Sequence, residues 1–237
     1  MFTVNRNTLM KNDLITLDFI ANNNWERPVY FAITTGSEAY LNMEAYFQLE
    51  GLTYRLVPIR TEMGADREIG HINTDIMYDN LMNKFVWGNM DKDGIYLDET
   101  ILRQTKNMRN LFYRLAKKLV DEGQKDKAIK VLDRCIEVMP EKNVPYDVFM
   151  IRIIEGYYLA GAKDKAASLT KRLADVYKER YAYFNSFRGS KLVKRVETNI
   201  NEAYQVVGYC QQVANMYGDK ATSDEIQKIM SGMQQPM

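Results

Sequence analysis

The sequence predicts an α+β, mostly helical protein: a small N-terminal α/β module packed on a C-terminal array of helical hairpins. Three observations indicate this class. Apolar residues recur at helical spacing through most of the second half, an apolar run of strand-forming residues stands at 29–33, and charges divide unevenly along the chain. Residues 1–100 contain 8 Lys and Arg against 15 Asp and Glu, whereas residues 101–237 contain 24 against 16. We therefore predict two domains, 1–98 and 99–237.

The composition is that of a folded chain with a sizeable core. With 46% hydrophobic residues and 5 prolines among 237 residues, long disordered stretches are not expected. No run reaches the roughly 18 apolar residues of a membrane-spanning helix, and the N-terminus does not resemble a signal peptide. Any export signal is therefore expected outside this sequence. Cys135 and Cys210 fall in helical patterns, which favours packed thiols over a disulfide or a metal site.

The first domain opens with a short strand predicted at Phe2–Val4. Asn12 or Asp13 is placed to cap a helix that runs to about residue 22, and one of the asparagines at 22–24 is expected in the left-handed conformation. The run VYFAI at 29–33 is almost wholly apolar. Such a run predicts a strand covered on both faces, within a parallel or mixed sheet.

The remaining elements before residue 99 alternate between extended and helical patterns. They are, in order, a strand at Leu52–Arg60, a loop at 63–73, a helix from Thr74 or Asp75 to about Phe85, and turns at 87–89 and 91–94. Pro58 places the end of the strand at a sheet edge, because proline donates no ladder hydrogen bond. A long helix over 99–122 then enters the second domain.

The stretch from Arg109 to Pro140 has the pattern of two short antiparallel helices joined by a turn and closed by a proline. Nine residues match, in order, the large, small, turn and proline positions of one helical-hairpin repeat: Phe112, Leu115, Ala116, Leu119, Gly123, Ala128, Leu132, Cys135 and Pro140. That repeat is the tetratricopeptide (TPR) unit of about 34 residues. The match predicts architecture rather than chemistry, because repeat scaffolds host many functions.

Two further repeats follow the first. The segment GQKDKA at 123–128 reappears as GAKDKA at 161–166, an offset of 38 that leaves four extra residues near 142–145. The predicted repeats are 109–140, 147–178 and a degenerate 196–232, whose last helix begins at a Thr222–Glu225 capping box. Because about three repeats are needed to close a core, we expect the array to pack against the first domain.

Two segments of the first domain, followed by helical repeats, resemble one known family. The segments are NNWERPVYF at 23–31 and FQLEGLTYRLVP at 47–58. They resemble the soluble C-terminal region of large multi-pass bacterial membrane proteins related to protein O-mannosyltransferases of the glycosyltransferase C superfamily. A eukaryotic relative with TPR repeats mannosylates receptor ectodomains. The resemblance spans nearly the whole chain.

The resemblance implies an extracytoplasmic accessory domain of a membrane protein glycosyltransferase, on the periplasmic face of the inner membrane, and a fragment of a longer protein. In that superfamily the catalytic acids lie in a loop between early membrane helices, and the lipid-linked sugar donor binds beside the bilayer. This sequence contains none of that portion, so no catalytic residue carries over. No cofactor is implied.

The sharpest polar-aromatic cluster is Asn24-Trp25-Glu26-Arg27, where the first predicted helix returns to a strand. Aromatic and charged side chains together line many ligand sites. The alternative, and the commoner role of such residues, is packing: Trp25 would fill the core while Glu26 and Arg27 pair and bond loop carbonyls.

The predicted repeats suggest a concave groove for a polypeptide partner, lined from the first helix of each repeat. The residues expected to line it include Arg109, Tyr113, Asp147 and Ile151. Peptide binding is expected of such grooves in general and is not indicated by these particular side chains.

A basic and aromatic segment at 171–195 is the third candidate surface. Eight cations stand there against two acids, with tyrosines and phenylalanines between them: Lys171, Arg172, Lys178, Arg180, Arg188, Lys191, Lys194 and Arg195. Anionic lipid headgroups and nucleic acid are the partners that such a segment suggests. The formal net charge of +1 argues against nucleic acid, so lipid headgroups remain, with a solvated helix face as the alternative.

Two patterns resemble metal or catalytic sites and do not complete them. Asn89–Gly94 begins like a calcium loop, but Thr100 stands where the bidentate Glu is required, so a plain turn is favoured. His71, the single histidine, lies in a predicted loop with no partner at ligand or triad spacing. We assign no catalytic residue and no metal.

Two functions stay open. One is the non-catalytic accessory domain, which would position an acceptor polypeptide or brace the membrane part. The other is a free-standing TPR-type adaptor for protein–protein interaction. Enzyme activity within these residues alone is not expected.

Overall fold

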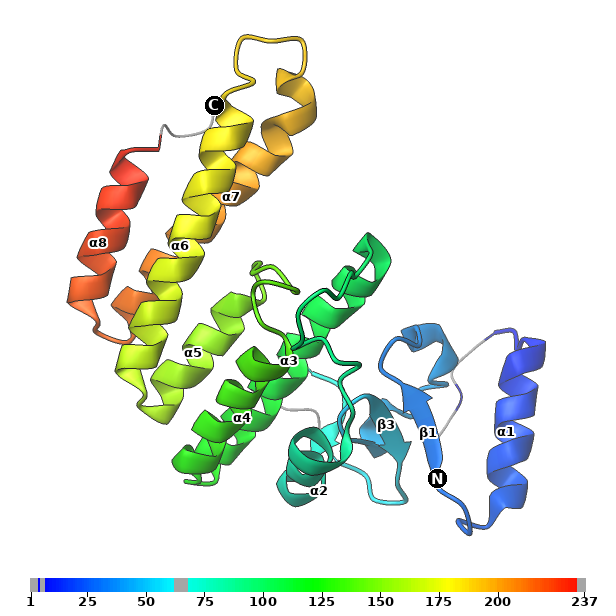
Figure 1. Ribbon diagram of the computed structural model, residues 1–237. Coiled ribbons are helices and arrows are strands. Elements are labelled where there is room, and N and C mark those ends of the chain that lie inside the picture. Colours follow the sequence, from blue (N-terminus) through cyan, green and yellow to red (C-terminus); the bar gives the residue numbers. More distant parts are fainter. Residues whose placement is uncertain (1–3, 5–6, 62–67, 234–237) are drawn as a thin grey trace. The chain divides into compact units, whose positions relative to one another are not determined.

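The computed structural model describes residues 4, 7–61 and 68–233 (Figure 1). The chain divides into two compact units, residues 1–85 and 86–237, and each is described by itself. The first contains one small sheet, and the regular elements of the second are all helices as far as it is described, so the prediction of a mostly helical α+β protein is confirmed. Apart from Val4, the strand predicted at Phe2–Val4 lies outside the described residues.

The first helix, α1, runs from Lys11 to Asn23. Neither Asn12 nor Asp13 is its N-cap as predicted: that position belongs to Met10, whose backbone N–H donates to Asp13 Oδ2 at 2.9 Å. Asp13 thus stabilises the helix start from within the first turn, where a carboxylate also favours the helix dipole. At the other end Asn24 adopts the left-handed conformation (φ 47°), which confirms the predicted asparagine cap.

A four-stranded mixed sheet follows, in the order β1-β3-β2-β4. Its strands are β1 (Val29–Ala32), β2 (Phe47–Leu49), β3 (Thr53–Leu56) and β4 (His71–Ile72). Antiparallel pairs join β1 to β3 and β2 to β3, and a parallel pair joins β2 to β4. The mixed sheet is confirmed, whereas the loop predicted at 63–73 is wrong at His71–Ile72.

The prediction that β1 is covered on both faces is also wrong. Its side chains alternate between partly buried and exposed, with Tyr30 and Ala32 on the exposed side. The reason is its antiparallel pairing with β3, since an antiparallel sheet is commonly covered on one face only. The Tyr30 hydroxyl uses this exposed face to donate to Glu50 Oε2 at 3.2 Å.

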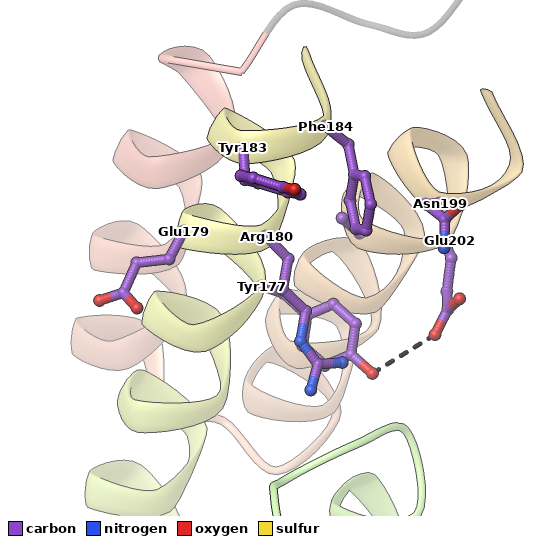
Figure 2. Close-up of a pocket in the computed structure, with 8 residues that line it drawn as sticks. Tyr177, Glu179, Arg180, Tyr183, Phe184, Asn199 and Glu202 are labelled. Atoms are coloured by element: carbon purple, nitrogen blue, oxygen red, sulfur yellow. Dashed lines mark hydrogen bonds between the residues drawn. The ribbon is translucent and has the colours of Figure 1, made fainter. Parts of the chain in front are cut away.

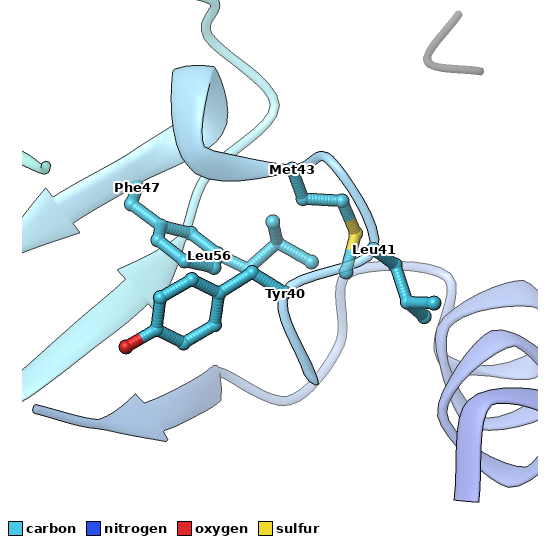
Figure 3. Packing of buried hydrophobic residues seen from close by; sticks show 5 residues of the cluster. All are labelled: Tyr40, Leu41, Met43, Phe47 and Leu56. Atoms are coloured by element: carbon cyan, nitrogen blue, oxygen red, sulfur yellow. The ribbon is translucent and has the colours of Figure 1, made fainter. Parts of the chain in front are cut away.

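An aromatic core covers the buried face of the sheet. Its fully buried members are Tyr40, Leu41, Met43, Phe47 and Leu56, which meet between the strands and the loop that precedes β2 (Figure 3). Phe47 lies at its centre, with ring centroids 5.1 Å from Tyr40 and 5.5 Å from Tyr54. Leu17 and Ile20 of α1 pack against the same cluster.

The first unit ends with a helix that changes its hydrogen bonding. The α-helix α2 (Thr74–Asp79) continues as the π-helix η3 (Asn80–Lys84), and Asn73 caps its start rather than the predicted Thr74 or Asp75. Asn80 Nδ2 donates to the Glu50 carbonyl at 2.8 Å, which ties the π-helix to the β2–β3 hairpin. At the tip of that hairpin Gly51 has φ +113°, a conformation that side chains rarely adopt.

Six helices in three consecutive pairs form the second unit. They are α3 (Glu99–Asp121), α4 (Lys125–Val138), α5 (Met150–Ala160), α6 (Lys163–Asn185), α7 (Val193–Met216) and α8 (Lys220–Ser231). Each pair packs on the next, α5 against both α3 and α4, and α7 and α8 against α6 (Figure 1). The helices predicted from residues 99, 123–140 and 147–178 are therefore present, and α6 continues to Asn185, about two turns further than expected. No helix in the described part of the chain combines the length and the apolar character needed to cross a bilayer.

The three helix pairs share one turn. Gly123, Gly161 and Gly218 all have positive φ, and the residue after each donates its N–H to the carbonyl five positions earlier. This is the hydrogen bonding of a Schellman cap, which glycine favours at the left-handed position. The third turn has an additional cap, since Asp219 rather than the predicted Thr222–Glu225 box accepts from the Thr222 N–H at 3.1 Å.

Candidate binding sites

The Asn24-Trp25-Glu26-Arg27 cluster forms a tight turn between α1 and β1. Asn24 and Trp25 are both left-handed, with φ 47° and 60°. Two hydrogen bonds close the turn: Glu26 N–H to the Asn23 carbonyl at 2.9 Å, and Asn23 Nδ2 to the Arg27 carbonyl at 2.7 Å. A bulky residue with positive φ is strained, and such strain is concentrated at functional sites.

Trp25 lines an apolar cavity of about 220 Å³ in the first unit. The other lining residues come from α1, the core loop and the end of β3: Ile20, Met43, Tyr46, Leu56, Val57 and Pro58. Trp25 is 54% exposed, so the alternative in which it fills the core is wrong. Glu26 and Arg27 are exposed and do not pair with each other within the described residues. The turn therefore presents one aromatic side chain beside a small apolar cavity.

Arg109 and Asp147, predicted on one groove, form a buried ion pair. Arg109 is 1% exposed, and its Nη1 lies 3.0 Å from Asp147 Oδ1. The same guanidinium donates to the carbonyls of Val144 and Pro145 at 2.7 and 3.2 Å. These carbonyls belong to the four extra residues of the 38-residue repeat offset. The longer α4–α5 loop is thus held by one arginine of α3.

Tyr113 and Ile151 lie near this pair on α3 and α5. Tyr113 is buried, its ring lies 5.3 Å from the Arg152 guanidinium, and burial raises the pKa of its hydroxyl. Ile151 is half-buried. Arg109 and Tyr113 therefore hold the first two helix pairs together, and their side chains are withdrawn from solvent in this structure.

A pocket of about 400 Å³ lies between α6 and α7 (Figure 2). Helix α6 contributes an aromatic and cationic side, and α7 contributes two polar side chains. The lining residues are Tyr177, Glu179, Arg180, Tyr183 and Phe184 of α6, and Asn199, Glu202 and Ala203 of α7. The Tyr177 hydroxyl points across the pocket toward Glu202 Oε1 at 3.5 Å, and Glu179 points away from it. The aromatic half was within the predicted segment 171–195, whereas Asn199 and Glu202 were missed.

Two contacts fix the cationic wall of this pocket. The Arg180 guanidinium lies 4.6 Å from the centroid of the Tyr177 ring and donates from Nη2 to the Tyr146 carbonyl at 3.1 Å. Burial raises the pKa of the Tyr177 hydroxyl, with the Arg180 charge opposing the shift, so Tyr177 stays a neutral donor at physiological pH. The pocket thus offers aromatic surface, a guanidinium, an amide and a carboxylate in one place.

The structure divides the basic segment 171–195 into two parts. On α6, Lys171 Nζ pairs with Glu225 of α8 at 2.6 Å and Arg172 pairs with Glu141 of the α4–α5 loop at 2.7 Å, so acids of neighbouring elements neutralise these cations. A second group, Arg188, Lys191, Lys194 and Arg195, follows in and after the α6–α7 connection, and its last three members are exposed.

The resemblance of Asn89–Gly94 to a calcium loop does not extend to a site. These residues form turns, and Asn143 Nδ2 donates to the carbonyls of Met90 and Lys92 at 2.7 Å each. The Asp93 carboxylate accepts from Lys142, which lowers its pKa. Among the described residues no group of three His, Cys, Asp or Glu side chains is placed to hold a metal ion.

Comparisons with known proteins bear on the first unit. Neither a curated protein nor a solved structure matches the chain. Residues 1–76 match a family model described as TMEM260-associated domain 2, and this span contains α1, the strained turn and the whole sheet. The match relates the first unit to an accessory domain of TMEM260-like membrane proteins.

Proposed function

We propose that this chain is a non-catalytic accessory domain of a membrane protein glycosyltransferase of the O-mannosyltransferase type, placed on the extracytoplasmic side to position an acceptor polypeptide. The observation that carries the proposal is the match of residues 1–76 to a domain associated with a membrane protein family. Both segments that resemble the O-mannosyltransferase relatives, 23–31 and 47–58, lie within that match and form the strained turn, β1 and the β2–β3 hairpin.

The α6–α7 pocket is the part of the helical unit best suited to hold a polypeptide. Its volume of about 400 Å³ falls in the range of small-molecule and side-chain sites. Phe184, which is half-buried, gives apolar contact at low entropic cost, while Asn199 and Glu202 offer hydrogen bonds to a peptide backbone or side chain. Aromatic and arginine side chains are enriched where polypeptides bind.

The first experiment measures the natural gene product with an antibody raised against this chain. An accessory domain predicts a band well above 27.6 kDa that sediments with membranes and resists extraction by alkaline carbonate. A soluble band near 27.6 kDa would refute the proposal and favour the free-standing adaptor instead.

The second experiment tests the acceptor role in cells that lack the gene. Complementation with the natural gene is expected to restore O-mannosylated peptides, measured by mass spectrometry of the secreted and membrane proteins. Glu202→Arg, which reverses a charge in the pocket, is expected to lower site occupancy roughly tenfold, the effect of losing one charge-assisted hydrogen bond. Glu197→Arg is the matched control, because Glu197 is also exposed on α7 but does not line the pocket.

The adaptor remains a second candidate, because three stacked helix pairs with a common turn also suit a protein that only binds. A photo-reactive phenylalanine derivative at position 184, where Phe184 lines the pocket, separates the two functions. Position 209 is the control, since Tyr209 is 45% exposed on α7 away from the pocket. Mannosylated partners crosslinked from position 184 alone support the accessory domain. Unmodified, stoichiometric partners support the adaptor.

A further inference from the structure

The connection between α6 and α7 carries an unbalanced positive charge. From residue 180 to 196 the chain contains five Lys and Arg and no Asp or Glu. Four of these cations are Arg188, Lys191, Lys194 and Arg195, within eight consecutive residues. No ion pair engages Lys191, Lys194 or Arg195 in the part of the chain that the structure describes, and all three are exposed.

Two of these cations stand where a helix normally places acids. Helix α7 begins at Val193, so Lys194 and Arg195 lie in its first turn, which has no acidic residue and no side-chain cap. The N-terminus of a helix carries a partial positive charge that favours anions and disfavours cations. Unlike α3 and α8, whose starts are capped by Asp98 and Asp219, the start of α7 therefore adds to the positive potential of its side chains.

Apolar side chains are exposed beside these charges. Leu192 is 44% exposed at the connection itself, and Tyr183 is 62% exposed on the last turns of α6. Tyr183 contacts Phe184 and Phe187 with ring centroids 5.2 and 5.5 Å apart, so the aromatic group is pre-arranged. Cations next to exposed leucine and tyrosine are typical of segments that rest on a bilayer, where the charges meet phosphates and the apolar groups enter the interface.

We propose that the α6–α7 tip, defined as Tyr183, Lys191, Leu192, Lys194 and Arg195, binds the surface of a membrane rich in anionic lipids. An acidic polypeptide would satisfy the same charges, but it leaves Leu192 and Tyr183 exposed, whereas a bilayer takes up both kinds of side chain. The inference rests on the proposed function for its biological setting, since an accessory domain of a membrane protein works beside a bilayer.

The test uses the purified 237-residue chain and flotation with vesicles of phosphatidylcholine alone or mixed with an equal part of phosphatidylglycerol. The chain is expected to float with the anionic vesicles and remain behind with the neutral ones, and added salt should weaken the binding. Each cation near an anionic surface contributes about fivefold to partitioning. Lys191→Gln/Lys194→Gln/Arg195→Gln should therefore lower the partition coefficient by roughly a hundredfold.

Matched variants distinguish binding through the tip from a general effect of the chain's net charge. Lys125→Gln/Lys130→Gln/Lys163→Gln removes the same charge at exposed positions, with Lys163 at the opposite end of α6, and should bind as the unmodified chain does. Leu192→Ser keeps every charge and should weaken binding severalfold at high salt, where the apolar contact dominates. Circular dichroism confirms that each variant is folded.

Three results would overturn the inference: equal flotation with both vesicle types, equal loss in the two triple variants, or binding of a poly-glutamate peptide without binding of anionic vesicles. The last result would assign the tip to an acidic polypeptide. Failure here is distinct from failure of the proposed function. A chain that floats but comes from a soluble 27.6-kDa gene product supports the lipid-binding tip and refutes the accessory domain. A chain that does not float but belongs to a larger, membrane-embedded gene product supports the accessory domain and refutes the lipid-binding tip.

Discussion

Substitution of Arg109 by methionine is expected to destabilise the helical unit by several kcal/mol. The buried guanidinium makes three hydrogen bonds, to Asp147 and to the carbonyls of Val144 and Pro145. Methionine fills a similar volume but satisfies none of these acceptors. Removing one partner of a buried ion pair costs about 3–5 kcal/mol, and the low end applies because Lys106 Nζ lies 4.0 Å from Asp147 and supplies part of the lost charge.

Urea unfolding followed by tryptophan fluorescence measures this loss in the correct unit. The chain has two tryptophans: Trp25 in the first unit, and Trp87, buried against Phe112 with ring centroids 5.2 Å apart, in the second. A Trp25→Phe background leaves Trp87 as the reporter, and its contact Phe112 lies one turn from Arg109 on α3. With a urea m-value of about 1–3 kcal/mol/M, a loss of about 3 kcal/mol lowers the midpoint by roughly 1–3 M.

The double variant Arg109→Met/Asp147→Asn is the control for the charge. Asparagine removes the unpaired carboxylate but keeps an oxygen for the Phe149 N–H, which donates to Asp147 Oδ1 at 3.2 Å. The double variant should regain at least half of the lost stability, because the cost of breaking such a pair lies mainly in the uncompensated charge. A single variant that loses less than about 1 kcal/mol, or a double variant as unstable as the single, would refute this account of the loop.

Three further predictions follow from single contacts. Gly208→Ala should stabilise α7 by about 0.5–1 kcal/mol, since its added Cβ meets only Met230 at 3.7 Å. Gly156→Ala in α5 should be less stable than Gly208→Ala by about 1–3 kcal/mol, because its Cβ meets Leu132 at 3.1 Å. Thermal melts compare the two variants, and equal effects would contradict the packing. Asp219→Asn should lower the free energy of unfolding at neutral pH. Although desolvation opposes ionisation, hydrogen bonds from the Thr222 N–H, the Thr222 hydroxyl and Tyr158 lower the pKa of Asp219. The stability difference between the variant and the unmodified chain is therefore present above pH of about 4 and disappears as the pH falls through the lowered pKa, which urea titrations at several pH values measure. Cys135 and Cys210 should not react with Ellman's reagent at pH 8 in the folded chain and should both react in urea, because burial raises the pKa of each thiol to about 12; rapid reaction of a native thiol would contradict their burial.

The helical half was predictable because its determinants are local. Gly123 and Gly161 recur in one hexapeptide pattern, and the structure gives both the same left-handed cap. The apolar periodicity of α3 places Phe112, Leu115 and Leu119 inside, where the structure has them fully buried. The two thiols, predicted as packed, are buried and free. The TPR assignment of these helix pairs, and their packing on the first unit, stay predictions.

The sheet was harder to predict because its pairing is set by residues far apart in sequence. The apolar run at 29–33 has no signal for the antiparallel partner β3, more than twenty residues later, that leaves Tyr30 exposed. β2 and β4 were missed because three- and two-residue strands have too few side chains for a period to appear. The capping errors at Asn12 and Thr222 have a local cause, since several polar residues stood next to each helix start.

The candidate sites divide in the same way. Sequence spacing placed Arg109 and Asp147 on one surface, and the structure joins them, but only the bent α4–α5 loop turns that surface into an interior. The pocket residues Asn199 and Glu202 were not predicted because only the pairing of α6 with α7 brings them to the pocket, with Glu202 meeting Tyr177 across 25 residues. The Trp25 candidate, in contrast, came from four consecutive residues, so no distant pairing was needed to find it. In the structure Trp25 has a positive φ and an exposed side chain.

The contacts of Arg109 also constrain the order in which the chain can fold during its synthesis. Its acceptors lie 35 to 38 positions further along, so the first helix pair leaves the ribosome with a charged group facing its own unfinished interior. The acceptors all belong to the α4–α5 loop, which ends before α5 begins at Met150. Emergence of that loop, ahead of the second helix pair, is therefore what lets the first pair bury its arginine.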